Sequence, residues 1–157
     1  FTLATPLQMA LVMSEAANGG KKYRPYLVKD IIAPDGTVIK HFDPVVERDL
    51  NIDPSVISLV QEGLHEVSTV GTAAAMFKDF PVPIAGKTGT AENSHGREHG
   101  WFVAYGPFDN PNIAVAVIVE NAGYGATSAV PIGYKILSAA FGLDKPKTPE
   151  NQPAPAQ

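Results

Sequence analysis

One short segment of the sequence, Ile84 to Glu92, has residue types and a spacing that could do chemistry. At its centre stands Lys87-Thr88-Gly89-Thr90. Alternate residues of a strand face the same way, so Thr88 and Thr90 would present their hydroxyls to one ligand. Gly89 has no side chain, which lets a substrate lie against the backbone as an added strand. Lys87 would point to the opposite side, where its ammonium could aid proton transfer or hold charge without a metal.

A phosphate-binding loop is the first alternative for this segment. Gly86-Lys87-Thr88 matches the end of the pattern G-x-x-x-x-G-K-[ST]. That loop needs glycine at position 81, where this sequence has Pro81, and a helix after the threonine, where a strand-like stretch follows. The nucleotide interpretation therefore fails. A structural strand with a glycine bulge explains the tetrapeptide alone equally well, so the flanking residues must decide.

Two helices with clear start signals are predicted in the first half of the chain. Thr5 is a good N-cap, Pro6 suits the first helical position, and Gln8 completes a capping box. Asn18-Gly19-Gly20 ends this helix. Asp53-Pro54 opens the second helix, in which apolar residues recur at helical spacing.

Strands are predicted between and after these helices. The expected strands are residues 26–33 and 37–42, a hairpin turning at residues 34–36, and then residues 84–92, 101–108 and 113–121. The last two should pair antiparallel, because Asp109 to Asn112 is a tight turn. Gly71 to Met76 predicts a short helix or a close-packed loop, and Ser128 to Phe141 a helix with Gly142 as its C-cap. We expect an α+β fold, an antiparallel sheet with packed helices, of which the last helix packs on one face.

The composition limits the possible classes of function. A length of 157 residues supports one ordinary core, and 45% hydrophobic with 18% charged residues is typical of a globular chain. The net charge of -4 shows no excess of basic residues, which argues against nucleic acid as a partner. Cysteine is absent, which excludes disulfides and thiolate metal sites. The longest apolar run, Ile113 to Val119, is far shorter than the ~20 residues of a membrane helix.

Three further stretches occur in a fixed order around the tetrapeptide. They are Thr5-Pro6-Leu7-Gln8-Met9-Ala10 before it, then His99-Gly100-Trp101-Phe102 and Glu120-Asn121-Ala122-Gly123-Tyr124-Gly125 after it. Together with the K-T-G element of penicillin-binding proteins and serine β-lactamases, this order resembles the C-terminal part of the transpeptidase domain of class B penicillin-binding proteins. The closest resemblance is to the penicillin-binding protein 2 type of the cell-elongation machinery. It covers residues 1–142; the proline-rich residues 143–157 are expected to form a disordered tail.

The resemblance implies a penicillin-binding protein/serine β-lactamase-like fold and a peptidoglycan DD-transpeptidase. Such an enzyme cross-links stem peptides through an acyl-serine intermediate and is acylated by β-lactams. Lys87 would bond the serine of a separate S-x-N motif, while Thr88 and Thr90 would bind the carboxylate of the donor peptide or of a β-lactam. The backbone N–H of Thr90 would be an oxyanion-hole donor. Gly89 would have to stay small, Glu92 would border the cleft, and no metal or cofactor is implied.

Two motifs of that family do not occur here. No serine has lysine three positions later or asparagine two positions later. The resemblance places S-x-x-K, with the nucleophile, and S-x-N before K-T-G, so we expect them in an N-terminal remainder of the same protein. We therefore interpret the chain, which starts at Phe1, as a fragment that forms no acyl-enzyme alone. The resemblance also implies an extracytoplasmic location, an N-terminal membrane anchor and a partner polymerase that makes glycan strands.

Other interpretations stay open from the sequence. A serine β-lactamase or β-lactam sensor shares K-T-G, and a non-catalytic cell-wall scaffold could share the fold. The loop from Asn93 to His99 contains two histidines, but its glycines favour a solvated loop over a metal site. Trp101 and Phe102 are expected to pack in the core and the cleft wall.

Overall fold

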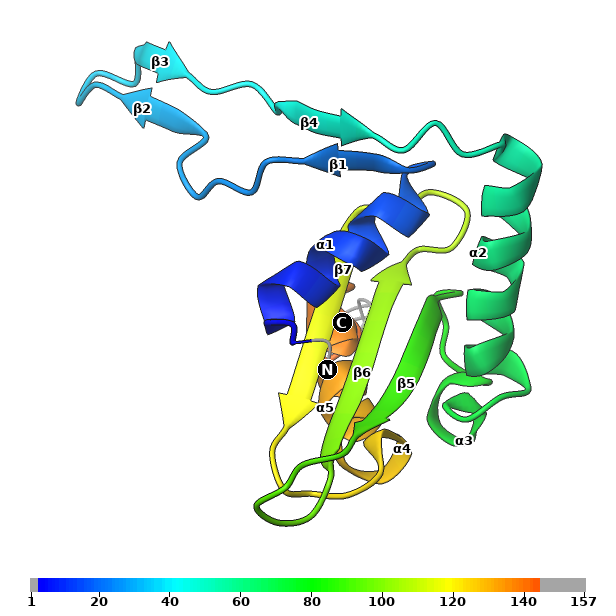
Figure 1. Ribbon diagram of the computed structural model, residues 1–157. Coiled ribbons are helices and arrows are strands. Elements are labelled where there is room, and N and C mark those ends of the chain that lie inside the picture. Colours follow the sequence, from blue (N-terminus) through cyan, green and yellow to red (C-terminus); the bar gives the residue numbers. More distant parts are fainter. Residues whose placement is uncertain (1–2, 145–157) are drawn as a thin grey trace, which may run out of the picture.

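The computed structural model describes residues 3–144, which form a three-stranded sheet between helices and a long β-arm that extends from one end (Figure 1). The sheet contains β5 (Ala85–Ala91), β6 (His99–Gly106) and β7 (Ile113–Val119) in that order. Both pairings are antiparallel. The three strands and the pairing of the last two are therefore confirmed.

Helix α1 (Pro6–Ala17) lies across one face of this sheet (Figure 1). Its start confirms the predicted capping box, because the Thr5 hydroxyl accepts from the Gln8 N–H and the Gln8 side chain accepts from the Thr5 N–H. Met13 is its buried residue and packs against Val103 and Tyr105 of β6. The apolar side of α1 thus covers part of one sheet face.

The opposite face of the sheet is covered by α3 (Ala74–Phe77) and α5 (Val130–Ala140). Phe102 is fully buried there and stacks on Phe77 at a centroid distance of 5.6 Å. Phe77 also meets Phe80 edge-on at 5.2 Å. Helices therefore lie on both faces, which confirms the α+β sheet with packed helices and adds a second covered face to the one that was expected. The reason is that β6 buries Phe102 and Tyr105 on opposite faces, and both side chains must be shielded from water.

The helical region after β7 differs from the prediction in one respect. A single helix from Ser128 to Phe141 was expected, whereas a one-turn helix, α4 (Gly125–Ser128), precedes α5. Pro131 stands in the first turn of α5, where its missing N–H costs no hydrogen bond. Gly142 follows the C-cap Phe141 with φ +70, the left-handed conformation that glycine adopts easily.

The arm consists of two antiparallel ribbons. β2 (Asp30–Ile32) pairs with β3 (Val38–His41), which confirms the predicted hairpin with shorter strands. β1 (Lys21–Tyr23) pairs with β4 (Val46–Asp49), a pairing that the sequence did not predict. Glu47 accepts from Lys22 at 3.3 Å and from Arg24 at 3.1 Å across this ribbon. The hydrogen bond from Arg24 is the main cause that lowers the pKa of Glu47.

Helix α2 (Pro54–Thr69) runs from the arm along the β5 side of the sheet (Figure 1). Asp53 caps its start by accepting from the Ser55 N–H at 2.8 Å, as the Asp53-Pro54 pattern predicted. The proline-rich tail predicted for residues 143–157 lies, from residue 145 on, outside the described residues. Between residues 3 and 144 none of the helices has both the length and the apolarity that crossing a bilayer requires.

Candidate functional site

A groove of about 520 Å³ runs along β5 on the face that α1 partly covers. Six consecutive residues, Lys87 to Glu92, border it, so six of the nine residues of the predicted segment lie at one cavity. Its other lining residues include Leu3, Met9, His99, Trp101, Val103 and Ile118. The structure therefore brings the tetrapeptide, the start of α1 and the His-x-Trp-Phe strand together around one hollow.

The register of β5 on β6 decides which side chains share a face. Lys87 lies opposite Val103 and Gly89 opposite Trp101, so these four share the α1 side of the sheet. A Cβ on Gly89 would lie 3.1 Å from the Trp101 Cβ, closer than most packed carbons. The glycine at this position therefore leaves space in the groove beside the Trp101 indole, which a larger side chain would fill.

β5 is an edge strand. Within residues 3–144 it pairs with β6 on one side and with no strand on the other. Its first half is anchored, since Ala85 is fully buried and the Ile84 carbonyl accepts from Ser68 at 2.8 Å. Its second half is more open: Lys87 and Thr90 are exposed and Gly89 is half-buried. An extended ligand could add to this second half as a further strand.

Lys87 projects from this open part of the strand. Its Nζ donates to the backbone carbonyl of Thr88 at 2.6 Å. Among the salt bridges of the described residues, none contains Lys87. A lysine ammonium has three donors, so it can also bind groups supplied by a substrate or by another part of the protein.

Thr88 and Thr90 lie on the sheet face opposite to Lys87, as the strand period predicted. The Thr88 hydroxyl lies 2.7 Å from the hydroxyl of Thr72, in the turn between α2 and α3. No pattern in the sequence points to Thr72, because no local signal specifies a contact between residues 16 positions apart. Thr90 lies opposite Gly100 and is exposed, with no neighbouring side chain on β6 to cover it.

The loop between β5 and β6 is held by polar contacts. Asn93 donates to the Arg97 carbonyl at 2.9 Å and to the Asn121 side chain at 2.6 Å. His99 Nδ1 accepts from the Asn121 N–H at 3.0 Å, which leaves its other ring nitrogen as the donor. Glu92 is exposed at the end of the groove. Within the described residues no three acidic, histidine or cysteine side chains converge as a metal site.

The comparison with known families decides the membership of this chain. The family described as penicillin binding protein transpeptidase domain matches residues 2–138. The chain belongs to this family. The resemblance seen in the sequence is thereby confirmed, as is the fold of penicillin-binding protein transpeptidase domains. The matched range holds every residue of the groove.

Individual members of the family show the same similarity. Peptidoglycan D,D-transpeptidase MrdA of Haemophilus influenzae is 36% identical over 154 residues, which are 85% of this chain and 23% of that protein. An imipenem acyl-enzyme complex of penicillin-binding protein A from M. tuberculosis has a TM-score of 0.75 and 36% identity, covering 88% of this chain and 31% of that one. A chain from a structure of a peptidoglycan synthase complex that coordinates polymerization and crosslinking has a TM-score of 0.77 and 36% identity. The match covers 94% of this chain and 25% of that one.

These penicillin-binding proteins are much longer than the matched region. The chain spans about a quarter of the length of the curated relatives it matches, 23% of MrdA and 29% of PbpA from Mycolicibacterium smegmatis.

Proposed function

We propose that this chain supplies the substrate-binding strand of a serine-type peptidoglycan D,D-transpeptidase that β-lactams acylate. The observation that carries the proposal is the position of Lys87-Thr88-Gly89-Thr90 on the open part of an edge strand that lines the groove of about 520 Å³. Relatives that are named D,D-transpeptidases and solved acyl-enzyme complexes of similar chains support it.

The stem peptide would bind as an extended strand beside β5. Backbone hydrogen bonds to the free edge would give affinity, and the space left at Gly89 would let the two backbones approach. The hydroxyls of Thr88 and Thr90 would bind the terminal carboxylate. A charge-assisted hydrogen bond of this kind is worth about 1.5–3 kcal/mol.

Two groups of this chain would act on the reacting atoms. The backbone N–H of Thr90 would donate to the oxyanion that forms when a serine from another part of the protein attacks the peptide carbonyl. Removal of such a donor costs about 3–4 kcal/mol of transition-state stabilisation in enzymes where it has been measured. The Lys87 ammonium would bond the serine of the S-x-N motif and so hold charge beside the nucleophile.

The reaction would proceed in two acyl transfers. The serine oxygen bonds to the carbonyl carbon of the donor peptide, and the bond to the terminal D-alanine breaks with a proton passing to its amine. An acceptor amine of a second stem peptide then attacks the ester, and the serine recovers its proton. Glu92, which lines the groove, would border the substrate cleft.

The partners and the location follow from the same proposal. The nucleophile and S-x-N would come from an N-terminal remainder of the protein, with its membrane anchor, and the enzyme would act outside the cytoplasmic membrane in the cell wall. A glycan-strand polymerase would be a partner, which the similarity to a chain of a peptidoglycan synthase complex supports.

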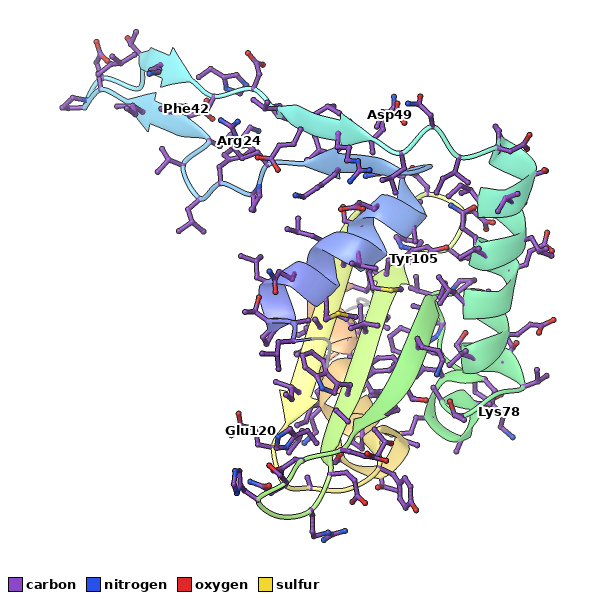
Figure 2. The ribbon with its side chains drawn as sticks, viewed as in Figure 1. Arg24, Phe42, Asp49, Lys78, Tyr105 and Glu120 are labelled. Carbon is purple, nitrogen blue, oxygen red and sulfur yellow. The ribbon has the colours of Figure 1, made fainter. Side chains whose placement is uncertain are left out.

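The test is labelling of the complete protein by a fluorescent penicillin. We expect a covalent, slowly released label, and we expect Lys87→Ala to abolish it while the melting transition is unchanged. Lys78→Ala is the matched control, because Lys78 is exposed beyond α3 and does not line the groove (Figure 2). Absence of a label in the folded protein would refute the enzymatic proposal and favour a scaffold. Rapid turnover of the label would favour a β-lactamase instead.

A further inference from the structure

Thr72 contacts the substrate-binding strand from outside the segment that motif comparison identifies. It lies in the turn between α2 and α3, and its hydroxyl is 2.7 Å from the hydroxyl of Thr88. We infer that Thr72 is a positioning residue, which turns the Thr88 hydroxyl hydrogen toward the substrate carboxylate. The inference rests on the proposed function and extends it to a residue that does not line the groove.

The backbone on either side of Thr72 is fixed by the core. Its neighbour Ala73 is 1% exposed, and the Ala73 N–H donates to the Val67 carbonyl in the last turn of α2 at 3.0 Å. The Ala73 carbonyl accepts from the Phe77 N–H at 3.1 Å, and Phe77 is buried against Phe102 of β6. Packing of this kind holds a side chain in place although Thr72 itself is exposed.

Thr88 is held from two directions. The Lys87 ammonium donates to its carbonyl at 2.6 Å, and Thr72 bonds its hydroxyl. These two contacts restrict both the main chain and the side chain of Thr88. The remaining freedom is the direction of one hydroxyl hydrogen.

The number of hydrogens decides that direction once a carboxylate is present. A hydroxyl carries one hydrogen and two acceptor lone pairs, and a carboxylate only accepts. If Thr88 donates to the carboxylate, Thr72 must be the donor in the bond between the two threonines. The resulting chain runs from Thr72 to Thr88 to the carboxylate, and each bond polarises the next. Without the Thr72 hydroxyl, the Thr88 hydrogen loses this constraint.

The test uses a ligand with and without the charge. Acylation of the complete protein is measured with a penicillin that has its free carboxylate and with the methyl ester of the same penicillin. Thr72→Val keeps the size of the side chain and removes the hydroxyl, whereas Thr72→Ser keeps the hydroxyl. Thr69→Val is the matched control, because the Thr69 hydroxyl lies near carbonyls of its own helix and does not contact β5.

We expect Thr72→Val to reduce the second-order acylation constant for the carboxylate about fivefold to tenfold, the size of one net hydrogen bond. The loss should appear as weaker initial binding, while the limiting acylation rate stays nearly constant. For the ester the same variant should change acylation less than about twofold. Thr72→Ser should recover the wild-type constant, and Thr69→Val should not differ from it.

Each other outcome overturns the inference. An equal loss for carboxylate and ester would show that Thr72 supports the strand in general. No loss for the carboxylate, with an unchanged melting transition, would show that Thr88 needs no positioning. In both of these results the proposed function stands as long as the wild-type protein is acylated normally. A wild-type protein that is never acylated would overturn both the inference about Thr72 and the proposed function.

Discussion

The hydroxyl of Tyr105 gives a quantitative test of how the core beneath the groove is packed. Tyr105 lies on β6, is fully buried, and packs beside Met13 of α1 and Phe108 (Figure 2). Its hydroxyl has no hydrogen-bond partner among the described residues. Burial raises the pKa of Tyr105 to about 12 from an ordinary value of 10.0. The perturbation is Tyr105→Phe, which removes the hydroxyl and keeps the ring.

The buried, unpaired hydroxyl of Tyr105 determines how the substitution should change the free energy of unfolding. An unsatisfied buried hydroxyl costs about 1–3 kcal/mol, so at pH 8 the variant should be as stable as the wild type or up to about 2 kcal/mol more stable. The pKa in the folded state lies above that in the unfolded state, so the unfolded chain loses its proton first as the pH rises. The contribution of Tyr105 to the free energy of unfolding is therefore fully present below about pH 10 and is lost as the pH rises toward 12. At about pH 11.5 the loss amounts to ~2 kcal/mol.

The assay is urea unfolding of the complete protein at pH 8 and at about pH 11.5. The difference between wild type and Tyr105→Phe cancels the titration of all other groups. Tyr124→Phe is the control, because Tyr124 is 72% exposed and its hydroxyl should titrate alike in both states. Destabilisation of Tyr105→Phe by more than about 1 kcal/mol at pH 8 would refute the reasoning, since it would mean that the hydroxyl has a partner. Equal pH dependence in wild type and variant would refute the burial argument.

Two further substitutions test how the groove is held in place. A Cβ on Gly125 would overlap the backbone carbonyl oxygens of Trp101 and Gly89, so the backbone of α4 or of the strands would have to shift. Gly125→Ala should therefore destabilise the protein by about 2 kcal/mol or more in urea unfolding and reduce penicillin labelling measured by gel fluorescence. Unchanged labelling would contradict the packing of α4 on the two strands. Thr5→Ala removes the capping box with Gln8 and should cost about 1 kcal/mol in the same unfolding assay, while Thr5→Ser should cost less; equal costs would contradict the cap.

Much of the local structure could be predicted from the sequence, because its signals lie within a few residues of each other. The capping box at Thr5 and the Asp53-Pro54 start predicted two helices, and the segment Ile84 to Glu92 predicted a strand with Thr88 and Thr90 on one face. The order of four motifs gave the family. The boundary near Ser128 was wrong, because a proline permits a helix start without showing whether the preceding turn is part of the same helix.

The tertiary structure alone decided which of these elements meet. The pairing of β1 with β4 joins residues more than 20 positions apart, and no local pattern specifies it. The contact of Thr72 with Thr88 depends on the packing of Phe77 against Phe102, which sets the turn after α2 beside β5. The functional groups of the K-T-G segment thus come from four consecutive residues, Lys87 to Thr90, and can be recognised in the sequence. The direction of their hydrogen bonds depends on side chains that only the packed core brings within reach, because a hydrogen bond requires a partner within about 3 Å.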